Sequence, residues 1–189
     1  MFFFNDICRH KFKAMKIILL GYMASGKSAV GKKLSDKLKM PFIDLDSYIE
    51  SHLNSSISEI FDKKGEIFFR LKESECLKEL LNREDDFILS LGGGTPCYAG
   101  NMDLIENSSS SMSFYLKTSV KTICNRLINE QDKRPIVARI KSEELPEFIA
   151  KHIFERSFFY EKATFNIKTD DKIISEISGE IAEIILNKP

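Results

Sequence analysis

Five short apolar runs along the chain have the length and composition of buried β-strands. They are residues 15–21 (MKIILLG), 41–46 (PFIDLD), 87–95 (FILSLGGGT), 111–118 (SMSFYLKT) and 164–169 (TFNIKT). The first of them is rich in β-branched residues and ends in glycine, as expected of a strand in a parallel sheet.

The segments between these runs have helical periodicity. In residues 27–40, the apolar positions Val30, Leu34 and Leu38 lie four residues apart, and Pro41 ends the pattern. Further helices are predicted over residues 47–81 with an interruption near Gly65, 119–129, 154–163 and 172–187. Strands that alternate with helices predict right-handed βαβ units, and therefore an α/β fold: a parallel β-sheet flanked by helices on both faces.

Two segments do not fit this alternation. Residues 1–14 (MFFFNDICRHKFKA) lack the apolar core and cleavage site of a signal peptide, so we expect a weakly ordered extension. Residues at about 126–147 are polar, poorly periodic and interrupted by two prolines, which is typical of a lid. We therefore expect residues 15–189 to form one domain that carries this lid.

Composition narrows the class of protein. The chain has 28 basic and 28 acidic side chains, whereas a nucleic-acid-binding protein usually has a basic excess. No apolar run approaches the roughly 18 residues of a membrane span. The four cysteines are widely spaced and suggest neither a zinc site nor a disulfide framework. We expect a cytoplasmic protein with no nucleic-acid or membrane partner.

Residues 21–28 (GYMASGKS) have the P-loop pattern and lie between a predicted strand and a predicted helix. The backbone N–H groups of such a loop, with the N-terminus of the helix, bind phosphate. We predict that Lys27 faces solvent and reaches the β- and γ-phosphates of a nucleotide, and that Ser28 holds Mg²⁺. Ala24 stands at a free position of the pattern where a third glycine is often found.

Asp44 and Asp46 are on alternate residues at the end of the second predicted strand, so their carboxylates should share a face. The carboxyl ends of parallel strands line the ligand crevice of such folds. One carboxylate would serve the metal and the other would accept a hydroxyl proton. Alternatively, an aspartate at this point is the N-cap of the helix that follows, and the sequence leaves both readings open.

The run Gly92, Gly93 and Gly94 suggests that a small ligand approaches bare backbone, although a tight turn is the alternative. Among the arginines, Arg134 lies in the predicted lid, where it could meet the transferring phosphate. Taken singly, Arg70 and Arg156 are more often surface residues than ligands. From these residues alone we infer a P-loop kinase that acts on a small hydroxylated, anionic molecule.

In their order along residues 15 to about 170, these motifs resemble those of the shikimate kinase family: GYMASGKS, FIDLD, FFR, SLGGGT, KRPI and ERSFFYEKA. The resemblance implies a nucleoside-monophosphate-kinase-like P-loop fold of three layers. It also implies transfer of the γ-phosphate of ATP to the 3-hydroxyl of shikimate, in aromatic amino acid biosynthesis, by a monomer that uses one Mg²⁺ per subunit. The alternatives are a gluconate-type or nucleoside monophosphate kinase, or a GTPase-like switch, although the chain has no N-K-x-D motif.

The resemblance also implies roles for individual residues. Asp46 would hold the 3-hydroxyl and take its proton, Asp44 would lie in the outer shell of the metal, and Arg70 and Arg156 would clamp the substrate carboxylate. The implied catalytic residues are Asp46, Lys27 and Arg134. The implied ATP contacts are Ala24, Ser25, Gly26, Lys27, Ser28, Ala29, Arg126 and Arg134, and the implied shikimate contacts are Asp46, Arg70, Gly92, Gly93, Gly94 and Arg156. Ala24 and Ile136 depart from the usual family residues, and the segment near Asp170 is given no role.

Overall fold

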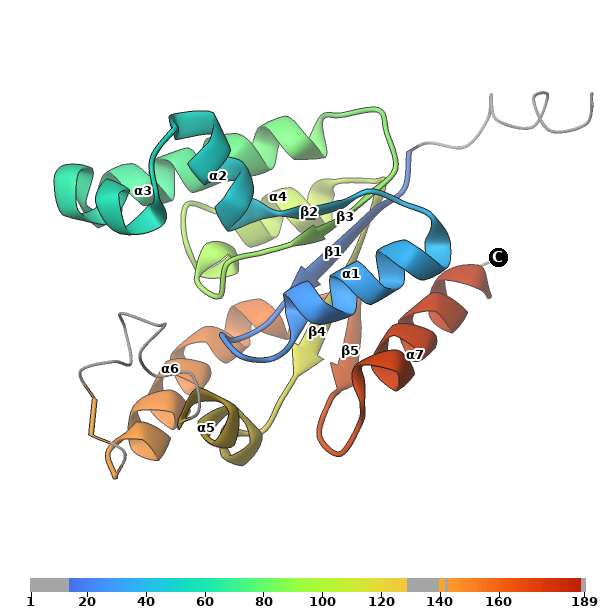
Figure 1. Cartoon of the computed structure of the whole chain (residues 1–189). Helices are drawn as coiled ribbons and strands as arrows, with labels where there is room; N and C mark the ends of the chain where they lie inside the picture. The colour runs from blue at the N-terminus through green and yellow to red at the C-terminus, as the bar shows by residue number, and fades with distance from the viewer. Residues whose placement is uncertain (1–13, 129–139, 142, 188–189) are drawn as a thin grey trace, which may run out of the picture.

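The computed structural model describes residues 14–128, 140–141 and 143–187. Within them, the chain forms a five-stranded sheet between two layers of helices (Figure 1). The strands are β1 (Lys16–Leu20), β2 (Phe42–Asp44), β3 (Phe87–Ser90), β4 (Ser111–Lys117) and β5 (Phe165–Lys168). Their order is β2-β3-β1-β4-β5, and every neighbouring pair is parallel. The predicted fold class is therefore confirmed.

The helices follow the strands in alternation, as the sequence predicts, but two elements were not predicted. The helices are α1 (Lys27–Leu38), α2 (Leu45–Leu53), α3 (Ile57–Leu81), α4 (Asn101–Asn107), α5 (Val120–Ile128), α6 (Leu145–Tyr160) and α7 (Ile174–Leu186), with a 3-10 turn η1 (Thr95–Cys97). The short elements η1 and α4 were missed. The start of α6 was placed too late, because its first residues follow a polar, proline-containing segment.

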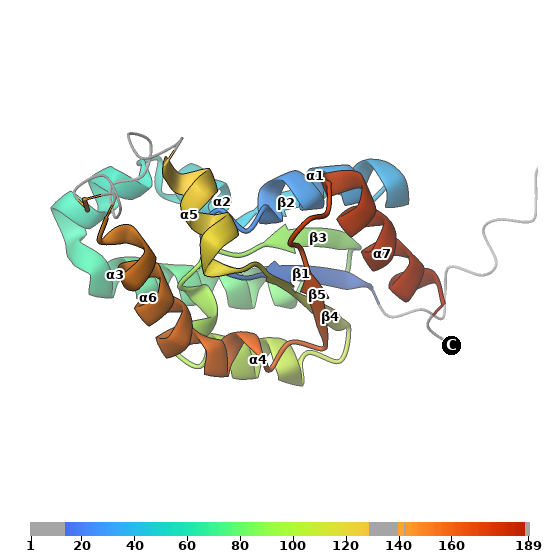
Figure 2. The same ribbon diagram turned by 90° about the horizontal axis from the view of Figure 1, so that it is seen from below.

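Alternation of side chains along β1 explains the two layers. Ile17 and Leu19 belong to a core cluster with residues of α1 and α7, whereas Ile18 and Leu20 belong to a second cluster with residues of α3, α4 and α6. Figure 2 shows α1 and α7 on one side of the sheet and α3, α4 and α6 on the other. Because both faces are buried, β1 is apolar at nearly every position.

Parts of the predicted extension and lid lie outside the described residues, namely 1–13, 129–139 and 142. At the two ends of the predicted lid, residues 126–128 belong to α5 and residues 145–147 to α6. Among the helices of the described residues, none has the length and apolar character that crossing a membrane would need.

Candidate active site

A cleft of about 990 Å³ lies at the carboxyl ends of the strands, and its walls include the segments that follow β1, β2 and β3. Ligands of parallel α/β sheets bind at this edge. The predicted site residues that line the cleft are Ala24, Gly26, Lys27, Ser28, Ala29, Asp44, Asp46, Arg70, Gly92, Gly93, Gly94, Arg126 and Arg156. The fold thus brings together residues from very distant parts of the chain.

The P-loop turns sharply between β1 and α1. Gly26 has a φ of 99° and is the N-cap of α1, so the amino terminus of that helix begins at the loop. Ala24 has a φ of 58°, which is a left-handed conformation that strains a residue with a β-carbon. Its carbonyl oxygen accepts a hydrogen bond of 2.9 Å from Nη1 of Arg126.

Lys27 is buried, with 9% of its surface exposed, which contradicts the prediction that it faces solvent. Its Nζ donates hydrogen bonds of 2.9 Å to the carbonyl oxygens of both Gly21 and Tyr22. These bonds hold the ammonium group against the inner wall of the P-loop. They also give Lys27 a structural role in addition to its place in the cleft.

Ser28 and Asp44 form a direct pair beside the P-loop, because Oγ of Ser28 donates a hydrogen bond of 2.8 Å to Oδ2 of Asp44. Asp44 occupies the N-cap position of α2, but its side chain makes no capping hydrogen bond there. Asp46 lies in the first turn of α2. The prediction that Asp44 and Asp46 alternate along a strand was therefore wrong for Asp46. Both carboxylates nevertheless line the cleft.

The carboxyl group of Asp46 is perturbed by its surroundings. Burial, and then the negative charges of Asp44 and Glu73, raise the pKa of Asp46 from 3.8 to about 6, although the nearby Lys27 and Arg70 lower it. A carboxylate with a pKa close to the working pH is a better proton acceptor than an ordinary surface aspartate. This electrostatic setting is typical of an active site.

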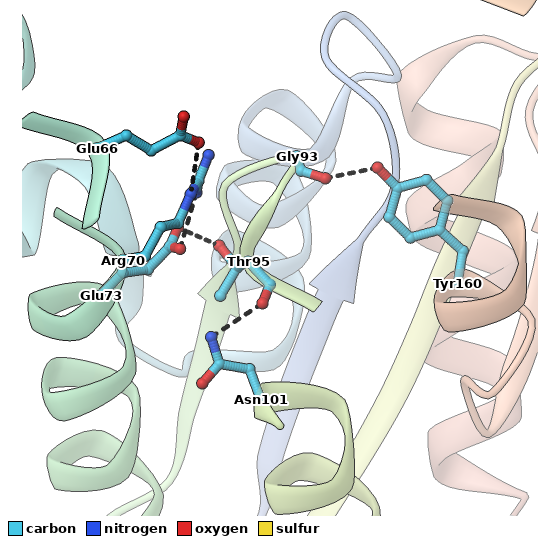
Figure 3. A network of polar contacts seen from close by, with 7 residues as sticks. All are labelled: Glu66, Arg70, Glu73, Gly93, Thr95, Asn101 and Tyr160. Carbon is cyan, nitrogen blue, oxygen red and sulfur yellow. Dashed lines mark hydrogen bonds and ion pairs between the residues drawn. The ribbon is translucent and has the colours of Figure 1, made fainter. Parts of the chain in front are cut away.

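Arg70 belongs to a network of polar contacts (Figure 3). Its Nη1 donates a hydrogen bond of 2.9 Å to Oε2 of Glu73, and its Nε lies 3.3 Å from Oε1 of Glu66. Glu73 is fully buried, and its other oxygen accepts a hydrogen bond of 2.6 Å from Oγ1 of Thr95. Glu73 was not predicted from the sequence, where its only signal is its position one helical turn after Arg70.

The glycine run forms a tight turn, one of the two readings that the sequence left open. The Thr95 N–H donates to the Gly92 carbonyl over 3.2 Å, so a tight turn is present. A β-carbon at Gly92 would also lie 3.1 Å from Oδ1 of Asp46, and one at Gly94 would lie 2.9 Å from Nη2 of Arg70. Side chains here would therefore push away the acidic and basic groups of the cleft.

Arg156 enters the cleft from α6, with its guanidinium carbon 5.6 Å from the centre of the Tyr22 ring. At the opposite side of the P-loop, a β-carbon on Gly26 would lie 3.7 Å from Cδ1 of Ile174 and 3.8 Å from Nη1 of Arg126. Ile174, with its exposed neighbour Ile173, was not predicted as part of the site.

One predicted contact does not line the cleft, and another lies outside the described residues. The side chain of Ser25 is buried and does not line it, and the Ser25 N–H donates to the Tyr22 carbonyl over 3.2 Å. Arg134 lies outside the described residues.

A P-loop, two neighbouring carboxylates and three arginines in one cleft, on a three-layer α/β fold, define the class: a P-loop kinase of a small molecule. A family model described as shikimate kinase matches residues 23–186. The chain therefore belongs to the shikimate kinase family.

Individual relatives agree with this assignment. The chain is 49% identical over 170 residues to a shikimate kinase of Flavobacterium psychrophilum, covering 90% of this chain and 98% of the relative. It is 46% identical over 170 residues to a shikimate kinase of Flavobacterium johnsoniae, with the same coverage.

Solved structures give the same result. The fold is similar to the crystal structure of shikimate kinase from Bacteroides thetaiotaomicron, with a TM-score of 0.83 and 31% identity over 91% of this chain and 98% of that one. It is also similar to shikimate kinase from Acinetobacter baumannii in complex with shikimate, with a TM-score of 0.80 and 29% identity over 92% of this chain and 93% of that one. These matches decide against the gluconate-type and switch alternatives.

Proposed function

We propose that the described cleft carries out the reaction of its family, the transfer of the γ-phosphate of ATP to the 3-hydroxyl of shikimate. The enzyme is an ATP-dependent phosphotransferase of aromatic amino acid biosynthesis. The observation that carries the assignment of roles is that a phosphate-binding loop and a carboxylate–arginine cluster share one cleft. Asp46 lies where the two meet, close enough to both Lys27 and Arg70 for their charges to lower its pKa.

The P-loop side of the cleft binds ATP in this proposal. The backbone of the loop and the amino terminus of α1 hold the phosphates, with Ala24, Gly26, Ser28 and Ala29 around them. Lys27 supplies positive charge from its buried position, since its ammonium group already lies at the base of the loop. Arg126 and Ile174, which flank Gly26, provide a cationic and an apolar surface for the adenine ring.

The residues beside the P-loop fit a magnesium ion. Ser28 and Asp44 present oxygen atoms 2.8 Å apart, and Mg²⁺ prefers oxygen ligands and keeps several of its waters. The described residues contain no cluster of three or more His, Cys, Asp or Glu side chains that could hold a metal, so the set fits an ion bound mainly through phosphates and water. Ser28 would bind it directly and Asp44 through water, and the bound ion would neutralise charge on the phosphates.

Asp46 is the proposed general base. Its burial and its acidic neighbours favour uptake of a proton, because they raise its pKa to about 6. At neutral pH the group is mostly ionised and therefore ready to accept the hydroxyl proton as the phosphate is transferred. Lys27 and Arg134 would stabilise the charge that develops on the phosphate.

The carboxylate of shikimate is proposed to bind between Arg70 and Arg156. Arg70 is held at its position by Glu73 and Glu66, which leaves its planar guanidinium oriented rather than free. Neither the Gly93 N–H nor the Gly94 N–H has a hydrogen-bond partner among the described residues, and both glycines line the cleft. Two guanidinium groups and two N–H groups form a suitable site for an anion.

We further propose that the enzyme works as a cytoplasmic monomer, in which residues 15–189 form one domain with a lid near residues 126–147. Cys76, Cys97 and Cys124 are free thiols, as is usual in a reducing compartment.

The proposed clamp is tested by changing each arginine to lysine, which keeps the charge but loses the planar, two-pronged geometry. Arg70→Lys and Arg156→Lys should each lower kcat/KM for shikimate about 10- to 150-fold, the value of one charge-assisted hydrogen bond. ATP binding measured without shikimate should not change. The matched control is Arg83→Lys, since Arg83 pairs with Asp85 outside the cleft and should have no effect.

An analogue of shikimate with an amidated carboxylate completes the test. The analogue should bind the unmodified enzyme as poorly as shikimate binds the variants. Each variant should bind shikimate and the analogue with similar affinity. If the losses from the analogue and from the variants multiply fully, the arginines do not bind the carboxylate and the clamp is wrong.

A further inference from the structure

The hydroxyl group of Tyr160 connects α6 to the glycine run that follows β3. Tyr160 is the last residue of α6, and its side chain is completely buried. Its hydroxyl donates a hydrogen bond of 2.5 Å to the carbonyl oxygen of Gly93 (Figure 3). Tyr160 belongs to the ERSFFYEKA motif of the family resemblance, which gave it no role.

The carbonyl that Tyr160 holds belongs to the peptide group between Gly93 and Gly94. A peptide group is planar and trans, so its N–H points away from its C=O. Fixing the Gly93 oxygen therefore also fixes the direction of the Gly94 N–H. That N–H is one of the two without a hydrogen-bond partner among the described residues, and Gly94 lies directly against the Arg70 guanidinium.

Among the described residues, this peptide group makes no other hydrogen bond, although Gly93 packs against the P-loop, where a β-carbon on it would lie 3.3 Å from the backbone N of Met23. The neighbouring turn is closed by the bond from the Thr95 N–H to Gly92 and by the bond from the Cys97 N–H to Gly94. Both bonds hold the carbonyl groups on either side of the Gly93 carbonyl. Because glycine has wide conformational freedom, two such residues in succession need an external contact to select one peptide orientation.

The same tyrosine lies one helical turn after Arg156, so the two side chains are on the same face of α6. Burial raises the pKa of the Tyr160 hydroxyl, although the positive charge of Arg156 lowers it. The hydroxyl therefore stays protonated and remains a donor. The hydrogen bond from Tyr160 to Gly93 thus fixes the orientation of the glycine peptide and holds the C-terminal end of α6, which carries Arg156.

We propose that Tyr160 is a positioning residue, which holds the Gly93–Gly94 peptide and Arg156 in the orientation that receives the carboxylate of shikimate. This inference rests on the carboxylate site proposed above. It assigns Tyr160 no contact with the substrate. The prediction that follows is a selective loss of shikimate binding when the hydroxyl alone is removed.

The test is Tyr160→Phe, which removes the hydroxyl and keeps the ring. We expect KM for shikimate to rise about 5- to 20-fold, the effect of losing one organising hydrogen bond. We expect kcat and KM for ATP to stay within about twofold. For the amidated analogue, the effect of Tyr160→Phe should be much smaller, because the organised peptide then has no anion to bind.

The matched control is Tyr115→Phe. Tyr115 is also buried, its ring packs 5.1 Å from that of Tyr160, and it does not line the cleft. It should lose stability without changing KM for shikimate. Equal changes in both variants, or a fall in kcat and ATP affinity in Tyr160→Phe, would mean that Tyr160 only supports packing, and the inference would be overturned.

Failure of this inference is distinguishable from failure of the carboxylate site. If Arg156→Lys weakens shikimate binding and Tyr160→Phe does not, the site stands and the positioning role of Tyr160 is wrong. If Arg156→Lys and Arg70→Lys have no effect either, the carboxylate site itself is wrong, and the inference falls with it.

Discussion

Ala24 is a strained residue inside the P-loop, because its φ of 58° brings its β-carbon into unfavourable contact with the backbone. Glycine would remove a strain of about 1–2 kcal/mol from the folded state. It would also give the unfolded chain more conformational entropy, which lowers the free energy of unfolding by about 0.4–1 kcal/mol. We therefore predict that Ala24→Gly leaves the free energy of unfolding unchanged or raises it by up to about 1.6 kcal/mol. Denaturant unfolding measures this difference.

The control for Ala24 is Ala150→Gly, an exposed position in the interior of α6 with ordinary helical backbone. Glycine there should lower the free energy of unfolding by about 1 kcal/mol. If both substitutions destabilise the protein equally, the left-handed conformation at Ala24 is not strained.

Asp46 should reduce stability at neutral pH, and the sign follows from its pKa. The folded-state pKa of Asp46 is about 6 and its usual value is 3.8, so the folded protein holds the proton more tightly than the unfolded chain. Stability is then lost as the pH rises from about 4 through 6. At about 1.36 kcal/mol per pKa unit, the loss reaches up to about 3 kcal/mol.

We therefore predict that Asp46→Asn raises the melting temperature at pH 7.5 and has little effect near pH 4, while kcat falls about 10²- to 10⁴-fold. Thermal unfolding across this pH range, with kcat measured at pH 7.5, checks both parts. A variant that is less stable than the original at pH 7.5 would contradict the raised pKa. A kcat within a few-fold of the original would contradict the role as base.

The site residues that belong to recognisable motifs could be predicted from the sequence. Residues that act by holding another group in place could not. Lys27 and Asp46 were found because phosphate and proton chemistry require such groups at such spacings. Glu73 was missed, and Tyr160, although it belongs to the ERSFFYEKA motif, was given no role, because each makes a hydrogen bond to a group far along the chain. A spacing pattern carries no signal for such contacts.

At the scale of the element, α3 is divided by Gly65, which has a φ of 79° and a ψ of 170°. Only glycine adopts this conformation without large strain. The break was predicted from the sequence, and the half of α3 that follows it carries both Arg70 and Glu73. A β-carbon at Gly65 would have nothing within 4 Å, so its cost would be conformational alone.

We predict that Gly65→Ala lowers the free energy of unfolding by about 1–3 kcal/mol, the cost of such backbone strain. The matched control is Gly179→Ala in α7, where the added β-carbon would lie 3.5 Å from Nζ of Lys37, an ordinary contact. This second change should stabilise the protein by about 0.5–1 kcal/mol. Denaturant unfolding of both variants tests the pair, and a neutral Gly65→Ala would mean that the helix straightens at no cost.

The elements that were missed are those without periodicity of their own. η1 and α4 are three and seven residues long, too short for a repeating apolar pattern. They are held instead by tertiary contacts, such as the bond of 2.9 Å from Nδ2 of the buried Asn101 to the Thr95 carbonyl. Longer elements such as α1 and α7, by contrast, were predicted to within a few residues.

At the scale of the whole molecule, the cleft exists only when both layers of helices are assembled on the sheet. Lys27 comes from the layer of α1 and α7, whereas Arg70 and Arg156 come from the layer of α3 and α6. The alternation of Ile17 and Leu19 with Ile18 and Leu20 joins the two cores through one strand. The sequence predicted this arrangement because a continuous apolar strand requires cover on both faces.

Stability of that assembly should not depend on residues 1–14. Among the described residues, hydrogen bonds to the domain begin at residue 15, whose N–H donates over 2.7 Å to Oδ1 of Asp86, and continue at Lys16. Nζ of Lys16, which is buried, donates to the Leu81 carbonyl over 2.8 Å and to Oγ of Ser110 over 3.0 Å. A chain that starts at Met15 keeps both sets of contacts.

We predict that removal of residues 1–14 leaves kcat, both KM values and the melting temperature nearly unchanged, the last to within about 2 °C. Lys16→Ala in the full chain is the control. It leaves the Leu81 carbonyl without this donor and should cost about 1–3 kcal/mol, or several degrees in melting temperature. If the shortened chain lost as many degrees as Lys16→Ala, the three phenylalanines of the first residues would pack against the domain. The boundary at residue 15 would then be wrong.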